Sequence, residues 1–174
     1  MTRIAIDMDD VMADTSIKIV QELNKKLNTN YQIPDLLKDI DLRNQFYTSY
    51  QENNSFLWDK GFFEDIPVKP RAQEVIQQLQ NHYEVFIVSA ATEFPNSMKE
   101  KLDWLGQYFP FINWTHVVFC GHKYLIQADY LIDDHEKNLS SFTGTPILFS
   151  APHNLHLTGY ERVNTWDEVA AKFL

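Results

Sequence analysis

Short apolar runs alternate with segments of helical periodicity along most of this chain. Runs rich in β-branched and aromatic residues predict buried strands at residues 4–11, 83–88, 117–120, 130–132 and 146–149. Apolar positions at helical spacing predict helices near 15–27, 70–79, 95–108 and 166–173, the third with Met98, Leu102 and Leu105 facing inward. Strands that alternate with helices predict an α/β fold, with a central parallel sheet between two helical layers.

The pattern changes between Tyr31 and Asp65. This stretch is rich in Asn, Gln, Asp and aromatic residues and has no clear strand run. We interpret it as two or three short helices inserted after the first strand and helix. The division predicted is a core of residues 1–14 and 66–174 and an insertion of residues 15–65, with the first helix bridging the two. The aromatic residues either line a pocket or form the core of the insertion.

Composition narrows the function classes. The net charge of −9 argues against a nucleic-acid polymer as partner, because phosphate backbones are bound by basic surfaces. A single cysteine excludes an intrachain disulfide and fits a reducing compartment. The start of the chain lacks a signal-peptide pattern, and no apolar run has membrane-spanning length. We therefore expect a cytoplasmic protein that does not bind membranes; the sequence leaves a homodimer open.

Polar residues that could take part in catalysis or bind a ligand follow four of the predicted strands. They are Asp7, Asp9 and Asp10 after the first, then Ser89, Lys123, and the pair Asp133 and Asp134. In a parallel sheet the carboxyl ends of the strands lie along one edge, so these groups should converge there. Each alone has an ordinary explanation, such as a helix cap or a solvated side chain; their shared position favours a site.

Such a cluster is suited to phosphate chemistry. Facing carboxylates repel unless a cation lies among them, and oxygen ligands suit Mg²⁺. A carboxylate can act as a nucleophile and form an aspartyl-phosphate. A lysine and a hydroxyl can meet the phosphoryl oxygens, while a second carboxylate, two residues from the nucleophile, exchanges protons with the leaving alcohol and water. The reaction predicted is hydrolysis of a phosphomonoester.

These residues resemble the four motifs of the haloacid dehalogenase-type phosphatase superfamily. A narrower resemblance is to the 5'(3')-deoxyribonucleotidases, and it covers nearly the whole chain, least clearly in the insertion. The stretches that carry it are Ala13-Asp14, Phe62-Phe63-Glu64 before Pro67, Val85–Ile87, Ala128–Asp134, and Leu148-Phe149 followed by His153–His156. The resemblance implies a Rossmann-like three-layer sandwich with a helical cap.

The resemblance also implies roles for the site residues. Asp7 would be the nucleophile and Asp9 the general acid/base. Mg²⁺ would be held by the Asp7 carboxylate, the Asp9 main-chain carbonyl and the Asp134 carboxylate, with Asp133 supporting them. Ser89 and Lys123 would bind the phosphate. The substrate implied is a small phosphomonoester, namely a (deoxy)nucleoside monophosphate whose sugar and base meet the cap.

The sequence also departs from this family. Asp10 stands where the animal enzymes have Gly, Ser89-Ala90-Ala91 replaces Thr-Ser-Pro, and Thr15 replaces an aromatic residue near the nucleoside. For His153 and His156 we expect a structural role against the last strand rather than a zinc site. Two alternatives stay open: a phosphatase for another phosphoester, such as a sugar phosphate, and a non-catalytic binding module of the same fold.

Overall fold

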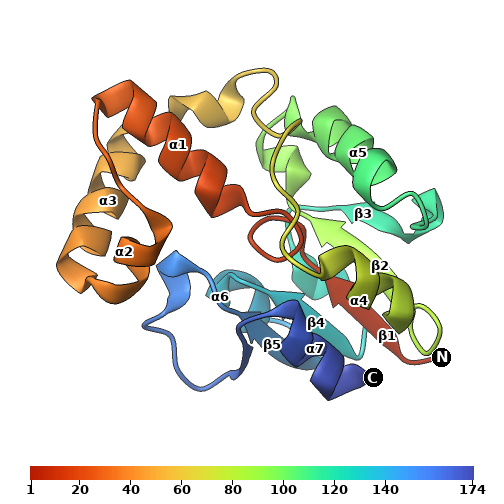
Figure 1. The fold of residues 1–174 in the computed structure, drawn as a ribbon. Coiled ribbons are helices and arrows are strands. Elements are labelled where there is room, and N and C mark those ends of the chain that lie inside the picture. Colours follow the sequence, from red (N-terminus) through yellow and green to blue (C-terminus); the bar gives the residue numbers. More distant parts are fainter.

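A six-stranded parallel sheet with the order β3-β2-β1-β4-β5-β6 forms the centre of the computed structural model, which describes residues 1–174 (Figure 1). The strands are β1 (Arg3–Ile6), β2 (Glu84–Ser89), β3 (Val117–Phe119), β4 (Tyr130–Asp133), β5 (Thr145–Phe149) and β6 (Glu161–Val163). The winding of the chain reverses at β1, which pairs with β2 on one side and β4 on the other. Ligands of open α/β sheets bind at such a reversal, beyond the carboxyl ends of the strands.

Alternate residues of the strands point to opposite faces of the sheet, and each face is covered. Ile4 and Ile6 lie in the larger buried cluster, whereas Ala5 lies in a second cluster on the other face. The larger cluster includes side chains of α4 (Ala72–Leu79), α5 (Ser97–Tyr108) and α7 (Trp166–Phe173), and the smaller one includes Leu139 of α6 (Glu136–Leu139). The three-layer, Rossmann-like α/β fold predicted from the sequence is confirmed.

A second group of helices stands apart from the sheet. It consists of α1 (Thr15–Leu27), α2 (Ile33–Lys38), α3 (Ile40–Asn53) and the 3-10 helix η1 (Asn54–Trp58), and Figure 1 shows it beyond one end of the strands. The remaining 3-10 helices are η2 (Ala91–Glu93), η3 (Trp114–His116), η4 (Lys123–Leu125) and η5 (Pro152–Asn154). Both α2 and α3 contact η5, which follows β5. The helical group therefore touches the sheet-bearing part at the loop after a strand end.

Three sequence expectations need correction. The first strand ends at Ile6, so the acidic residues lie in the following loop rather than in extended backbone. A sixth strand, β6, was not predicted because three residues at a sheet edge carry little periodicity. Met98 and Leu102 of α5 are exposed, at 37% and 49%, and only Leu105 faces inward as predicted.

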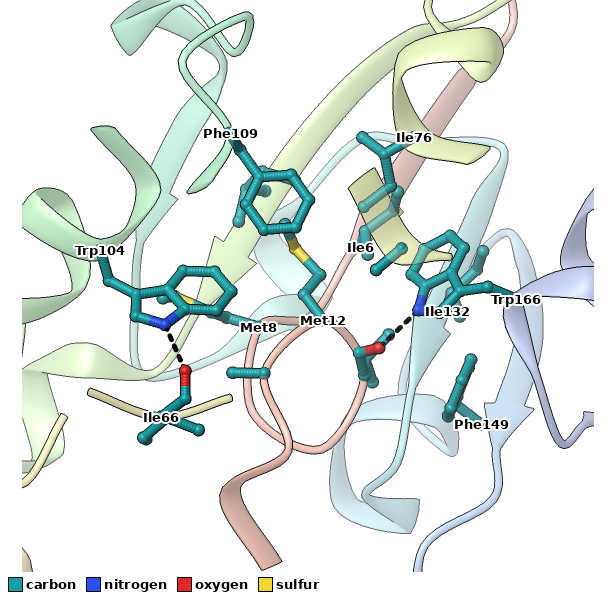
Figure 2. Packing of buried hydrophobic residues seen from close by; sticks show 14 of the residues in the cluster. Ile6, Met8, Met12, Ile66, Ile76, Trp104, Phe109, Ile132, Phe149 and Trp166 are labelled. Carbon is teal, nitrogen blue, oxygen red and sulfur yellow. Dashed lines mark hydrogen bonds between the residues drawn. The ribbon is translucent and has the colours of Figure 1, made fainter. Parts of the chain in front are cut away.

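Two buried tryptophans hydrogen-bond to the loop that follows β1 and to the stretch that precedes α4. The Trp166 Nε1–H group donates a hydrogen bond of 2.8 Å to the Val11 carbonyl, and Trp104 donates one of 2.7 Å to the Ile66 carbonyl (Figure 2). Met8 and Met12 pack between the two indole rings (Figure 2). Each indole thus satisfies a buried carbonyl while filling the core, and the loop has little freedom to move. No helix of the chain has both the length and the apolar character needed to cross a membrane.

Candidate active site

The loop after β1 places Asp7 at the centre of the strand ends. The Asp7 N–H donates a 2.9 Å hydrogen bond to the Ile132 carbonyl, so the residue continues the pairing of β1 with β4. The Met12 and Ala13 N–H groups both donate to the Met8 carbonyl at 2.9 Å, which closes a tight turn. The Asp7 side chain is therefore buried at a position that the backbone fixes.

Lys123 pairs with carboxylates from two different strand ends. Its Nζ donates to Asp7 and, at 2.6 Å, to Asp133 Oδ2. Asp133 also accepts 3.0 Å hydrogen bonds from the Asn138 amide and one of 2.8 Å from the His135 N–H. The ammonium and both carboxylates are almost completely buried, and each has a hydrogen-bonded partner, which reduces the cost of burying it.

A second lysine, Lys101 of α5, forms an ion pair with Asp9. Its Nζ donates to Asp9 Oδ2 and, at 3.1 Å, to the Ser89 hydroxyl, and it lies 4.7 Å from the centre of the Phe63 ring. The Thr15 hydroxyl donates to the other Asp9 oxygen at 3.1 Å. Asp9 is thus oriented from both sides, by the sheet-bearing part and by the start of α1.

Sequence reasoning missed Lys101 because it assigned the wrong face of α5. The buried residues of this helix are Ser97, Glu100, Lys101, Trp104 and Leu105, which follow the helical spacing of one face. Glu100 accepts hydrogen bonds from the Gly61 and Phe63 N–H groups, at 2.7 and 3.1 Å. One clue in the sequence was Trp104. The helix face that contains this tryptophan is the buried one, rather than the face that contains Met98, and Lys101 lies one turn before Trp104.

The Asp134 carboxylate is buried and only partly satisfied. It is 1% exposed, and its Oδ1 has no hydrogen-bond partner. Carboxylate oxygens of Asp7, Asp133 and Asp134 lie within 4.8 Å of one another. Three buried carboxylates with one paired ammonium leave an excess of negative charge, and an unpartnered buried oxygen is costly. The donor set is all oxygen, so the residues present fit a divalent metal ion such as Mg²⁺.

The burial of these groups shifts their pKa values. Burial, partly offset by Lys123, raises the pKa of Asp7 to about 7. Burial and the neighbouring Asp7 and Asp133 raise the pKa of Asp134 well above its ordinary range. Burial acts in the same direction on Asp9, but Lys101 and its hydrogen bond outweigh it and lower that pKa. In the protein without metal or substrate, the two carboxylates therefore differ in proton affinity in the order opposite to the one that an ionised nucleophile and a protonated general acid need.

A cavity of about 360 Å³ opens above these groups. Its floor includes Asp7, Asp9, Lys123 and Asp134. One wall comes from the helical group, and the remaining lining comes from the sheet-bearing part, with residues such as Glu93, Lys101 and His153. The wall from the helical group is largely apolar or aromatic; it includes Ile19, Ile33, Leu36, Phe46, Tyr47 and Tyr50. A polar floor below an apolar wall is the pattern of a small-molecule site.

Asp10 ties the start of α1 to the site. Its backbone has φ +52°, in the left-handed region. Its carboxylate accepts hydrogen bonds of 2.7 Å from both the Ser16 N–H and the Ser16 hydroxyl, so it caps the helix. Asp14, the residue just before the helix, makes no capping bond and pairs with Lys69 at 3.2 Å. The loop geometry decides which of the nearby carboxylates reaches the free N–H.

The structure brings all the candidate residues into one region, in two layers. Asp7, Asp9, Lys123 and Asp134 line the cavity. Ser89 and Asp133, both 0% exposed, lie behind them and contact Lys101 and Lys123. The convergence expected from a parallel sheet is therefore found, with Lys101 and Asp10 as additions.

Comparisons with known proteins agree with this geometry. The family model described as "5' nucleotidase, deoxy (Pyrimidine), cytosolic type C protein" matches residues 1–174. The 5'(3')-deoxyribonucleotidase of Bacillus subtilis strain 168 is 41% identical over 174 residues, which cover 98% of each chain.

Solved structures of haloacid dehalogenase-like proteins share the fold at low identity. A hydrolase of this family from Deinococcus radiodurans R1, with bound phosphate and sodium, has a TM-score of 0.59 and 14% identity, covering 99% of this chain and 94% of that one. A Bacillus subtilis hydrolase of the family, bound to magnesium, has a TM-score of 0.58 and 12% identity, covering 99% of this chain and 98% of that one. With its sheet, its strand-end carboxylates and its match over every residue, this chain belongs to the family of cytosolic type C deoxy (pyrimidine) 5' nucleotidases, which makes it a hydrolase of the phosphatase class.

Proposed function

We propose that this protein is a Mg²⁺-dependent phosphatase that hydrolyses (deoxy)nucleoside monophosphates through an aspartyl-phosphate on Asp7. The observation that carries the proposal is the cavity floor, where Asp7, Asp9, Lys123 and Asp134 come together from separate segments of the chain. Family membership supports nucleotides as the substrate class.

In the first step, an Asp7 carboxylate oxygen attacks phosphorus while the bond from phosphorus to the nucleoside oxygen breaks. The leaving oxygen takes a proton from Asp9. In the second step, Asp9 takes a proton from water, the resulting hydroxide attacks the same phosphorus, and the Asp7 carboxylate departs. Orthophosphate and the nucleoside are released, and both aspartates return to their starting states.

Asp9 must carry a proton when the nucleoside leaves, although Lys101 lowers its pKa in the free protein. A phosphate dianion on the cavity floor would compete with Asp9 for the Lys101 ammonium. That competition would raise the pKa of Asp9 at the moment when a proton is needed. We assign Lys101, with Ser89 and Lys123, to the binding of the phosphoryl oxygens.

The residues that would hold Mg²⁺ are Asp7 and Asp134, through their carboxylates, and Asp9, through its main-chain carbonyl. When bound, the ion supplies positive charge against the phosphoryl oxygens. Asp133 keeps Lys123 in place beside Asp7 and is in turn fixed by Asn138.

We assign residues 15–65 to a cap over a core of residues 1–14 and 66–174. The two connections between them run side by side: the Asp14 N–H donates to the Pro67 carbonyl at 2.7 Å, and the Lys69 N–H donates to the Met12 carbonyl at 2.8 Å. Neighbouring connections suit a unit that moves as one body. Aromatic walls suit a flat base, so the cap is the part that would select the nucleoside.

Hydrolysis of a panel of phosphomonoesters, compared by kcat/KM with and without EDTA, tests the proposal. We expect activity that requires Mg²⁺, is highest on nucleoside monophosphates, and is lost in Asp7→Asn while the variant stays folded. A preference for sugar phosphates over every nucleotide would contradict the substrate class. Absence of Mg²⁺-stimulated phosphate release from any ester would favour a non-catalytic module.

A further inference from the structure

Two histidines that have no part in the proposed phosphate chemistry lie beside Asp134. His135 follows Asp134 directly after β4, and His153 comes from η5 after the neighbouring strand β5. Their rings are stacked, with centres 4.5 Å apart and planes inclined by 23°. Both histidines line the same cavity as the acidic residues.

The nitrogen atoms of both rings face one carboxylate oxygen. The Nε2 atoms of His135 and His153 lie 3.8 and 3.3 Å from Asp134 Oδ2. With bond lengths of about 2.0–2.2 Å, two ligand atoms on one tetrahedral zinc ion are about 3.3–3.5 Å apart. The observed spacings are close to this separation, so only small side-chain movements would bring all three atoms into a coordination shell.

The surrounding contacts hold this arrangement in place. The Asn154 amide donates hydrogen bonds of 2.8 Å to the carbonyls of both Asp134 and Phe149, which joins the loop after β4 to the loop after β5. Arg162 donates to the Asn154 side-chain oxygen at 3.0 Å and so fixes the amide. His153 Nε2 itself lies 3.1 Å from the Asp134 carbonyl, a contact that metal binding would replace. Ligands oriented by such a second layer of contacts lose little freedom on binding a metal.

We propose that His135, His153 and Asp134 form a binding site for a transition metal ion of the Zn²⁺ type. Imidazole nitrogens suit Zn²⁺ but not Mg²⁺, which prefers oxygen. A neutral His153 would bind through Nε2 with its one ring proton on Nδ1, and a protonated His153 would release one proton to solvent. One imidazole from each of two loops and one carboxylate would make three ligands, all from residues that line the cavity.

Asp134 would then be shared by two ions of different chemistry. This sharing, though not the zinc binding itself, rests on the proposed Mg²⁺ site. Because both ions draw on the same carboxylate, occupancy of one site changes the affinity of the other. A transition metal would therefore alter Mg²⁺ binding from within the site.

Titration of metal-free protein with Zn²⁺ against a chelator of known affinity tests the proposal, with the visible absorption of bound Co²⁺ as a second measurement. We expect His135→Ala and His153→Ala each to weaken Zn²⁺ binding by about tenfold or more, by analogy with the loss seen when groups around a metal are removed. His156→Ala is the matched control, since His156 is exposed and lies outside the cluster. The half-exposed His135 can be replaced without creating a buried cavity.

Zn²⁺ binding that is undiminished in both histidine variants would overturn the proposal and place the ion among the carboxylates instead. Absence of Zn²⁺ binding to the wild type would overturn it as well. Asp7→Asn keeps the three proposed ligands, so it should bind Zn²⁺ although it lacks the proposed nucleophile. If it does so while the wild type shows no phosphatase activity, the zinc site stands and the proposed function fails.

Discussion

Replacing the buried carboxylate Asp7 by its amide should abolish turnover and at the same time stabilise the metal-free protein. Raising its pKa from 3.8 to about 7 corresponds to about 4 kcal/mol in favour of the protonated folded state, at about 1.4 kcal/mol per pH unit. Asp7→Asn removes this ionisation and leaves Lys123 paired with Asp133. The folded variant should therefore not bear the free-energy cost of ionising a buried carboxyl group, which the wild type does bear.

The sign of the effect depends on pH. Below about pH 4 the carboxyl group is protonated in both the folded and the unfolded state, and the two proteins should differ little. As the pH rises from about 4 to about 7 the unfolded state ionises first, so the wild type loses stability relative to Asp7→Asn. Above pH 7 the difference should approach 4 kcal/mol at most, or on the order of 10 °C in Tm for a chain of this size.

Thermal and urea unfolding in EDTA across this pH range, followed by circular dichroism, provides the assay. Asp103→Asn is the control, because the Asp103 side chain is exposed and forms an ion pair only with Lys99. Added Mg²⁺ should narrow the difference by stabilising the wild type, by about 2.7 kcal/mol at a concentration 100 times its Kd and about 4.1 kcal/mol at 1,000 times its Kd. A variant that is no more stable than the wild type in EDTA at pH 8 would refute the reasoning.

Substitutions at three further positions test other parts of the structure. Lys101→Met should lower kcat/KM by about 10²–10³, the usual cost of one donor to developing charge, and steady-state activity near the wild-type value would exclude Lys101 from phosphate binding. Asp10→Ala should lower the free energy of unfolding by about 1–3 kcal/mol, because it removes the cap and leaves an alanine in left-handed backbone. Asp10→Gly should lose only the cap, so equal urea midpoints for the two variants would count against backbone strain. Gly144→Ala would place a methyl group 2.6 Å from the Ala128 and Asp129 carbonyl oxygens and should cost about 1–3 kcal/mol, so an unchanged Tm would mean that this loop can relax.

The sequence by itself determined the frame of the protein. Apolar runs marked five of the six strands, and their alternation with helices implied a parallel sheet. A parallel sheet gathers its strand ends at one edge, so Asp7, Lys123, Asp133 and Asp134 could be brought together without coordinates. This works because strand position depends on local periodicity and the convergence follows from a topological rule.

Only the tertiary structure decided which other groups join them. Lys101 is separated from Asp9 by 92 residues, and its burial is tolerated only because that carboxylate is opposite it. Local periodicity treats a lysine as an exposed position, so it chose the face of α5 with Met98 and Leu102. The left-handed Asp10 and the approach of His153 to Asp134 likewise depend on loops whose paths are set by long-range hydrogen bonds. Periodicity reports which residues avoid water, whereas the pairing of buried charges depends on contacts between distant segments.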